Sequence, residues 1–368
     1  MDIRELRSAI RGSYSERLSD HGVERVRPLP ANRWILSSAL QKSIRRGDTE
    51  IGLRAALGLL EADPRTLWRR LMSIGFEDVG LGGLEVASAV PALLEAATWR
   101  KAVGEARIAN WIAEQLCAAP KSRSADDVLV ALQYHPGLED LMGRLAEVET
   151  SQLLDTIANQ SIDIVERCAT AWYALGTPRL REANIIQRNG CQGIWSALAD
   201  LGVPETLIAS SELACRRTNN PLALFVCVLS IDRPKGSVET PSFYQSELID
   251  GIPAYTLDGF TRSGKAAIRS WRAQSETLGQ YPLRSIQLAL FFIEGALVTP
   301  AHTWSETTRL RQLAVEAGVG GNRLTQAQTS QLMKAVENEL PTLLGHRRRA
   351  LAMEENCSPI DLFSGTAR

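Results

Sequence analysis

Residues 67–81 read Leu67-Trp68-Arg69-Arg70-Leu71-Met72-Ser73-Ile74-Gly75-Phe76-Glu77-Asp78-Val79-Gly80-Leu81, and this stretch decides the prediction of the fold. Its apolar residues recur at helical spacing, with an arginine pair beside them. An acidic pair follows, and Gly80 is a residue that can end a helix. The stretch therefore predicts an amphipathic helix with charged groups of both signs close to its end.

Three helices are predicted between residues 32 and 80. Asn32 is expected to cap the first, Asp48 or Thr49 the second, and Asp63 the third, where Pro64 follows as the first helical residue. Gly and Pro punctuate further helical patterns near residues 84–97, 98–118, 124–134, 149–159, 161–175, 191–202, 204–217, 220–230, 256–274, 283–297, 303–317 and 325–344. Ala and Leu dominate and only 6% of residues are aromatic. We therefore expect few or no strands and an all-α fold of stacked helical hairpins or a multi-helix bundle.

The same punctuation divides the chain into regions. Pro28 and Pro30 interrupt the first amphipathic pattern, and several Pro and Gly residues make 231–254 the least regular part. The predicted regions are an N-terminal arm (1–30), a helical domain (31–135), a helical extension (136–230), a linker or irregular segment (231–254), a C-terminal helical region (255–346), and a basic run with a flexible tail (347–368).

Composition and charge exclude several classes of protein. The chain has 368 residues, of which 45% are hydrophobic, and its formal net charge is −1. This balance excludes a protein that coats nucleic acid with a uniformly basic surface, so any nucleic-acid contact must be local. The six cysteines lack metal-ligand spacing, so we expect reduced, buried thiols. No apolar run approaches the roughly 18 residues that cross a bilayer, and we predict a cytoplasmic protein without a membrane partner.

One segment imitates a nucleotide-binding loop. Gly259-Phe260-Thr261-Arg262-Ser263-Gly264-Lys265-Ala266 fits G-x-x-x-x-G-K, but Ala266 stands where a phosphate loop needs Ser or Thr. The preceding residues include Pro253 and show little strand pattern. The other interpretation is a basic helical face of Arg262, Lys265, Arg269 and Arg272. Neither a metal motif nor a nucleophile motif is present, and we expect no catalytic residues, metal or cofactor. An enzyme or nucleotide-binding protein with a site around Gly259–Arg272 is the alternative.

Other charged residues suggest contacts with nucleic acid. Packing the first helix against the third would gather five cations that could contact phosphates, namely Lys42, Arg45, Arg46, Arg69 and Arg70. A solvated helix face is the other interpretation of this set. Glu77 and Asp78 are a paired-carboxylate candidate, against a structural ion pair with Arg69 and Arg70. Four tryptophans are candidates for base stacking, against a role in the core: Trp34, Trp68, Trp99 and Trp111.

Four segments in fixed order carry a resemblance to a known family. They are Ser38–Asp48, Leu67–Leu81, Glu105–Ile108 and Ala119–Ser122. Together they resemble the helical C-terminal half of the replication-associated recombination protein A (RarA, also called MgsA) family of AAA+ ATPases, relatives of the clamp loaders. The resemblance covers about residues 36–131, and no Walker motifs or arginine finger accompany it.

The resemblance implies an architecture and a function. Members of that family are DNA-dependent ATPases at stalled replication forks, and their helical C-terminal part forms oligomers. It implies a clamp-loader-collar-like N-terminal third here, with structural roles for Glu77, Asp78, Gly80, Pro120, Lys121 and Ser122. We therefore expect a non-catalytic oligomerisation or adaptor protein of DNA replication, recombination or repair. Its expected partners are a second copy of itself, DNA, replication or repair proteins and a separately encoded ATPase.

Overall fold

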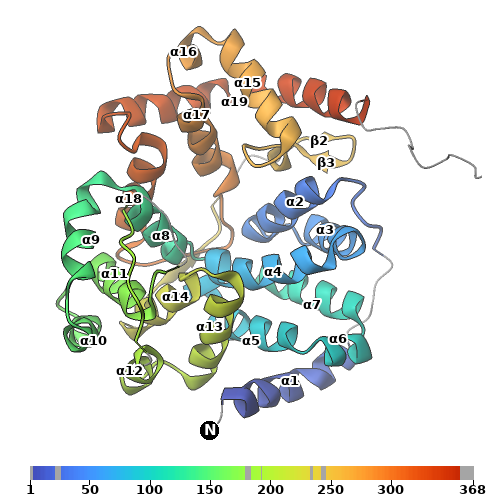
Figure 1. Ribbon diagram of the computed structural model, residues 1–368. Helices are drawn as coiled ribbons and strands as arrows, with labels where there is room; N and C mark the ends of the chain where they lie inside the picture. The colour runs from blue at the N-terminus through green and yellow to red at the C-terminus, as the bar shows by residue number, and fades with distance from the viewer. Residues whose placement is uncertain are drawn as a thin grey trace, which may run out of the picture.

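The computed structural model of the chain describes residues 3–20, 26–178, 184–191, 193–232, 235–241 and 246–356. Within these ranges helices dominate, and the strands are two or three residues long. The prediction of an all-α fold of many packed helices is confirmed. In Figure 1, α2–α7 lie on one side, α8–α14 on the other, and most of the C-terminal third lies above both.

The first third of the chain contains the segments that decided the prediction. Its helices are α1 (Ile3–Asp20), α2 (Arg33–Arg46), α3 (Thr49–Ala62), α4 (Pro64–Ile74), the π-helix η1 (Gly75–Val79), the 3-10 helix η2 (Gly80–Gly83), α5 (Leu84–Glu95), α6 (Ala97–Val103), α7 (Glu105–Ala118) and α8 (Ser124–Tyr134). The region predicted as an N-terminal arm contains α1, which packs against α5 and α13. Gly104, at a φ of 107°, separates α6 from α7, where one helix was predicted over 98–118.

The predicted caps of the first three helices are present. Asn32 accepts from the backbone N–H groups of Trp34 and Ile35, and Asp48 accepts from that of Ile51. Asp63 accepts from the N–H of Thr66, with Pro64 as the first residue of α4. These side chains satisfy amide groups that have no partner within the first turn of a helix, so the boundaries are local properties of the sequence.

From residue 136 onward the chain forms a series of helices, and short strands appear only after α14 in the described residues. Its elements are η3 (Pro136–Leu138), α9 (Glu139–Ala146), α10 (Thr150–Ala158), α11 (Ile164–Leu175), α12 (Ile194–Asp200), α13 (Glu205–Thr218), α14 (Leu222–Ile231), β1 (Ser237–Glu239), β2 (Leu248–Ile249), β3 (Ile252–Pro253), η4 (Ala254–Thr256), α15 (Arg262–Gln274), α16 (Glu276–Gly279), α17 (Leu283–Leu290), η5 (Phe291–Gly295), β4 (Ala301–Thr303), α18 (Thr307–Val315), η6 (Glu316–Gly320) and α19 (Gln326–Asn356). The described part of the predicted irregular segment thus holds three strands, of which β1 pairs with β4 and β2 pairs with β3.

An extended crossing joins the two halves of the chain at the backbone. The N–H of Lys121 donates to the carbonyl of Pro300, and the N–H of His302 donates to the carbonyl of Lys121, both at 2.7 Å. The N–H of Thr299 donates to the carbonyl of Arg45, also at 2.7 Å. The segment around residue 300 therefore completes hydrogen bonds for α2 and for the stretch that follows α7.

Apolar side chains form one large and two smaller clusters. The large cluster runs through α1–α14 and includes Trp172, Phe225 and Phe76. A second cluster, which includes Ile268 and Trp271, packs α15 and α17 against α19. A third, small cluster joins the start of α2 to the β2–β3 hairpin and the end of α19. The C-terminal helices thus have their own core but contact α2 directly.

Two features of the long helix α19 differ from the prediction. Arg347, Arg348 and Arg349 lie inside this helix, although a basic run preceding a tail was expected there. The guanidinium of Arg347 is buried and forms an ion pair with Glu294 at 2.5 Å. The predicted tail beyond Asn356 lies outside the described residues.

No single described helix is both long and apolar enough to cross a membrane. A bent pair, Pro64–Glu95 with Ala97–Val103, meets that criterion by length and composition when taken together. Its apolar residues Leu67, Leu71 and Val90 are buried in the core of this fold.

Candidate functional site

The carboxylate of Asp78 is the centre of a buried ionic network. The π-helix η1 turns this side chain inward, and none of it is exposed. Arg45 approaches it with Nε at 2.5 Å, Arg123 donates through a second guanidinium, and the amide of Gln41 donates at 3.0 Å. Burial raises the pKa of this carboxyl, but the two guanidinium groups outweigh burial and hold the pKa below its usual value. Asp78 is therefore ionised and fully paired.

Glu77 lies beside Asp78 at the edge of the same network. Its carboxylate accepts from Arg45 at 2.8 Å and from Gln41 at 2.5 Å. Burial and the neighbouring Asp78 raise the pKa of Glu77. The acidic pair thus takes part in structural ion pairs, although its partners are Arg45 and Arg123 where Arg69 and Arg70 were expected.

The prediction of a surface patch on α2 is wrong, because the cations of this helix are buried and have partners inside the protein. Lys42, Arg45 and Arg46 are only 4%, 2% and 7% exposed. Lys42 forms an ion pair with Asp258 at 2.7 Å, and Arg46 stacks on the ring of Tyr255 with its Cζ at 4.6 Å. These side chains are turned toward the C-terminal elements and away from solvent, so they form no phosphate-binding surface.

The two cations predicted on α4 differ from each other. Arg69 is exposed, while Arg70 is half-buried and donates to the amide oxygen of Gln41. Arg70 therefore borders the buried network, and Arg69 is left as the solvent-exposed member of the set of five.

The other residues of the family resemblance meet at one turn. Gly80 adopts a φ of 42° at the end of η1, and the N–H of Ser122 donates to the carbonyls of Asp78 and Val79. A Cβ on Gly82 would collide with the backbone of Pro120 and Lys121. The Nζ of Lys121 donates to the carbonyls of Cys117 and Ala119, and burial lowers the pKa of this amine to about 8. The structure brings these residues together as packing and hydrogen-bonding groups.

The segment that imitates a phosphate loop is a capped helix start. It follows the 3-10 turn η4, and Asp258 accepts from the N–H groups of Phe260 and Thr261 at 2.8 and 3.2 Å. Thr261 caps α15 by accepting from the N–H of Gly264. A Cβ on Gly264 would collide with the backbone of Asp258. No buried strand enters this turn and no open loop of amides remains, so the nucleotide-loop interpretation of Gly259–Ala266 is wrong.

The basic face predicted on α15 is exposed. Arg262, Lys265 and Arg269 are exposed at spacings of three and four residues, which place them on one face of the helix. Within the described residues, none of the three forms an ion pair or a side-chain hydrogen bond. Arg272 is different, because its guanidinium donates to the carbonyls of Tyr281 and Gly279 at 2.9 Å.

An exposed aromatic residue stands at the start of this face. Phe260 is 64% exposed, and its ring meets that of Phe291 edge to face at a centroid distance of 5.9 Å. Phe291 in turn meets Phe292 at 5.4 Å, and the latter lines a cleft of about 380 Å³ between α8, α17 and η6. The cleft was not predicted from the sequence, because Tyr134 and Phe292 line it from segments far apart in the chain.

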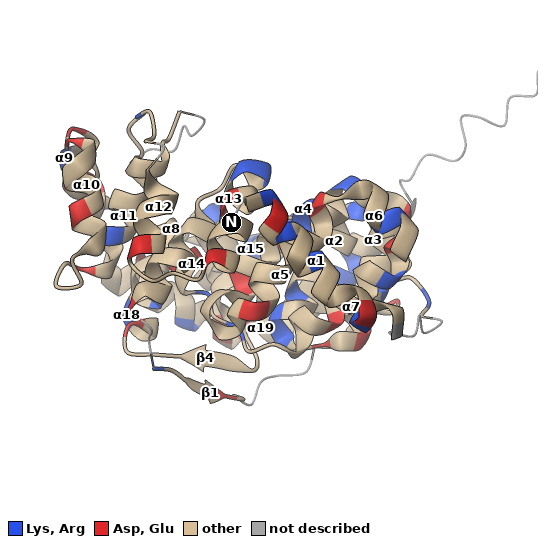
Figure 2. Cartoon of the chain, turned by 90° about the horizontal axis from the view of Figure 1, so that it is seen from below, with Lys and Arg blue, Asp and Glu red and all other residues tan. Residues whose placement is uncertain are grey.

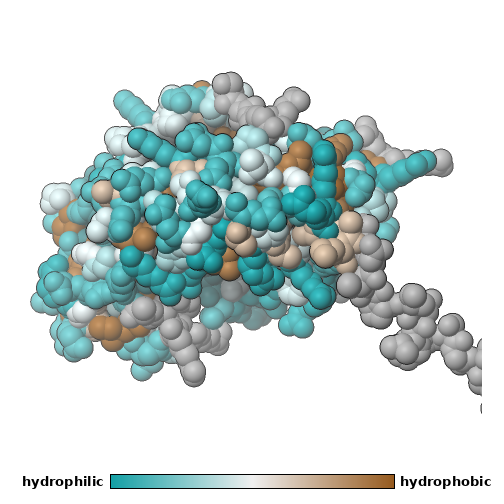
Figure 3. Space-filling model, turned by 90° about the horizontal axis from the view of Figure 1, so that it is seen from above, coloured by the Kyte–Doolittle hydropathy of each residue, from teal (hydrophilic) through white to brown (hydrophobic). Residues whose placement is uncertain are grey.

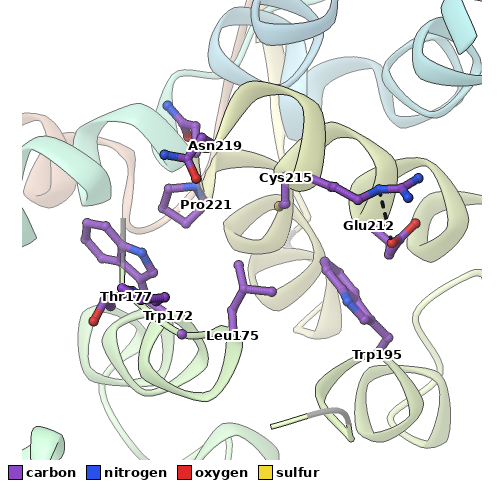
Figure 4. A pocket seen from close by; sticks show the side chains of 12 residues that line it. Trp172, Leu175, Thr177, Trp195, Glu212, Cys215, Asn219 and Pro221 are labelled. Atoms are coloured by element: carbon purple, nitrogen blue, oxygen red, sulfur yellow. Dashed lines mark ion pairs between the residues drawn. The ribbon is translucent and has the colours of Figure 1, made fainter. Parts of the chain in front are cut away.

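A second hollow lies among α11, α12 and α13 and has a volume of about 310 Å³ (Figure 4). Trp172, Leu175 and Trp195 contribute apolar walls, and its charged groups are Glu212 and Arg216, which pair at 3.7 Å. Glu212 also pairs with Arg7 of α1, so no unpaired charge is available to a ligand. Burial raises the pKa of Cys215 in this wall, which keeps the thiol protonated.

The exposed surface mixes charges of both signs. Figure 2 shows Lys and Arg interspersed with Asp and Glu over the helices. Seen from above, the face that carries α15 is largely hydrophilic, with hydrophobic residues in small separate groups (Figure 3). Of the candidate stacking residues, Trp34 is 60% exposed and lies under Arg33, Trp111 is buried, and Trp68 and Trp99 are half-buried.

Among the described residues, no group of three or more His, Cys, Asp or Glu side chains is arranged to hold a metal ion. Comparisons of the chain with protein-family models and with curated proteins find no match.

Proposed function

We propose that this protein is a non-catalytic helical adaptor that binds nucleic acid through the basic face of α15. It assembles with itself and with DNA replication, recombination or repair proteins. The observation that carries the proposal is the set of three exposed cations, Arg262, Lys265 and Arg269, which have no partner among the described residues and follow the exposed Phe260.

The basic face has the chemistry that a nucleic-acid backbone requires. Seven residues separate Arg262 from Arg269, a rise of about 10 Å along a helix, so the three cations can follow a phosphate chain. An exposed aromatic ring beside them offers a base a stacking surface, which every base can use regardless of its identity. The expected ligand is therefore single-stranded and is bound without sequence preference.

The distribution of paired charges supports an adaptor over an enzyme. Asp78, Asp258 and Glu294 are buried carboxyls whose pKa lies below the usual value, and each is held by a cation. Burial raises the pKa of three others, Glu77, Asp126 and Asp127, and each of these also pairs with an arginine. A general base or acid needs a proton-exchanging group with access to substrate. These carboxylates instead connect elements of the fold. The resemblance of residues 36–131 to an oligomer-forming region supports the assembly role.

Salt-dependent binding of a labelled oligothymidylate tests the nucleic-acid part. The variant Arg262→Ala/Lys265→Ala/Arg269→Ala is expected to bind more weakly, and the slope of log K against log salt to shrink by about 2, at roughly 0.7 per phosphate contact. The matched control Lys101→Ala/Arg144→Ala/Lys334→Ala removes the same charge from three other helices. Equal binding by both variants would contradict the proposal.

Light scattering on a size-exclusion column tests the assembly part. The full chain is expected to elute as an oligomer, or to become one when the strand is added. A monomer at every concentration, with and without oligothymidylate, would contradict self-assembly.

A further inference from the structure

We propose that the cleft between α8, α17 and η6 binds one nucleotide unit, with the base against Tyr134 and Phe292 and the phosphate on Arg284 and Arg323. The nucleotide is either free or part of a single strand. Only the second case rests on the proposed function, since a free nucleotide needs no contact with α15.

The cleft has the size and lining of a small-molecule site. Its volume is about 380 Å³, within the range of roughly 300–1,000 Å³ usual for ligand pockets. Its apolar wall is formed by Leu288, Phe291 and Phe292, and Tyr134 faces it from the end of α8. A planar, largely apolar ring fits such a wall better than a polar chain does.

The aromatic rings already carry cations on their faces. The Cζ of Arg284 lies 5.9 Å from the centroid of Tyr134, and the Cζ of Arg311 lies 5.7 Å from that of Phe292. Arg311 is held by Asp127 at 3.3 Å and is therefore fixed in place. Arg311 does not line the cleft, so a base that enters it meets the rings of Tyr134 and Phe292 and the guanidinium of Arg284, all of which stack on nucleobases.

The rim of the cleft supplies positive charge for a phosphate. Arg284 and Arg323 are exposed, line the cleft and form no ion pair within the described chain. The carboxylate of Glu316, which lies in the same turn, is already engaged by Gln312 at 2.9 Å, Gln326 at 2.7 Å and His135 at 3.4 Å. The net charge that faces an anion at this rim is therefore positive.

The glycine turn leaves room beside these arginines. Gly318, Gly320 and Gly321 line the cleft without side chains, and a Cβ on Gly318 would approach the ring of Phe292 to 3.0 Å. Gly321 adopts a φ of 50°, which other residues rarely adopt. The glycine backbone therefore packs closely against the aromatic wall, at a position where a larger side chain would press on the ring of Phe292.

A chain of aromatic contacts links the start of α15 to the cleft. Phe260 meets Phe291 at 5.9 Å, and Phe291 meets Phe292 at 5.4 Å, so three rings run from the start of α15 to the cleft. A strand whose phosphates follow α15 can place one base in the cleft.

Calorimetric titration of the full chain with dTMP, thymidine and inorganic phosphate tests the site, and oligothymidylate binding is measured in parallel. Phe292→Leu keeps an apolar side chain but removes the ring, and Arg284→Ala/Arg323→Ala removes the rim charge. Each is expected to weaken dTMP binding about tenfold, as for loss of one stacking or phosphate contact. Lys101→Ala/Arg144→Ala, which removes two exposed cations from α6 and α9, is the matched control and is expected to change nothing. Thermal unfolding confirms that each variant is folded.

The outcomes separate this inference from the proposed function. Loss of dTMP binding in both cleft variants supports the site for a free nucleotide. If the native chain shows no detectable dTMP binding but the cleft variants bind oligothymidylate more weakly than it does, the cleft is a site for one unit of a single strand. If dTMP binds, and the α15 variant binds oligothymidylate as tightly as the native chain does, the proposed cleft site is supported and the proposed role of α15 is contradicted. Unchanged affinity of folded cleft variants for both probes overturns the inference, as does a chain that binds neither.

Discussion

The basic residues of α2 and those of α15 have similar sequence patterns and opposite environments. Lys42, Arg45 and Arg46 lie in the interior, where carboxylates, carbonyl groups and an aromatic ring surround them. Arg262, Lys265 and Arg269 face solvent without ion-pair partners among the described residues. A cluster of cations therefore says little about binding until its carboxylate partners are known, and only the second cluster offers charge to a ligand.

The largest effect is expected at the centre of the buried network. Asp78→Asn keeps the shape of the side chain but removes the fully buried carboxylate between Arg45 and Arg123, which costs about 3–5 kcal/mol for a buried pair broken on one side. Urea denaturation measures the loss. Glu50→Gln removes an exposed carboxylate that pairs with the half-buried Arg54; it is the control and is expected to cost less than about 0.5 kcal/mol. If both variants lost the same free energy of unfolding, buried and exposed charges would contribute equally to stability, contrary to this expectation.

The buried amine of Lys121 is expected to make the stability of the protein depend on pH, which an exposed cation would not do. Its folded-state pKa is about 8 against 10.5 for the free amine, so between these values only the unfolded chain keeps the proton. Stability therefore rises with pH through this window, by about 3 kcal/mol relative to Lys121→Met, which does not titrate. Urea denaturation of both proteins from pH 7 to pH 10.5 measures the difference. A constant difference would show that the amine is not perturbed by burial.

A smaller effect is expected from Gly264→Ala, at the start of α15. The added methyl group meets the backbone of Asp258, and the neighbouring helix turn must shift at a cost of about 2 kcal/mol. Thermal unfolding checks this expectation. An unchanged midpoint would mean that the turn is open, as a ligand-binding loop would be, and would revive the nucleotide interpretation of this segment.

The smallest effect on stability is expected from the exposed cations. Arg262→Ala/Lys265→Ala/Arg269→Ala is expected to change the free energy of unfolding by less than about 0.5 kcal/mol per residue, because these side chains form no ion pair within the described residues. Urea denaturation provides the value. A loss of several kcal/mol would place this face among the structural elements.

Local chemistry explains which parts of the fold could be predicted. The starts of α2, α3 and α4 follow from Asn32, Asp48 and Asp63, whose side chains bond to amides two or three residues away. The prediction placed the start of α15 too early, near residue 256, because Asp258 and Thr261 first build a turn. Helix α9 (Glu139–Ala146) was missed, since its eight residues give too short a periodic pattern.

The candidate site depended on contacts that the sequence does not display. Lys42 meets the Tyr255 carbonyl 213 residues away, and Arg347 meets Glu294 across 53 residues. Spacing within one helix could predict that Arg262, Lys265 and Arg269 share a face. It could not predict that α2 would be covered, nor that Phe292 and Tyr134 would meet in a cleft.

The hydrogen bond from Arg45 to the carbonyl of Gly295 joins residues 250 positions apart. At the usual pace of synthesis, about 5–20 residues per second, a nascent chain holds that arginine for roughly 10–50 s before its acceptor is made. During that interval α2 can form, but the face of α2 that the C-terminal elements will cover remains exposed to water. The N-terminal helices therefore remain incompletely packed until the segment around Gly295 has been synthesised.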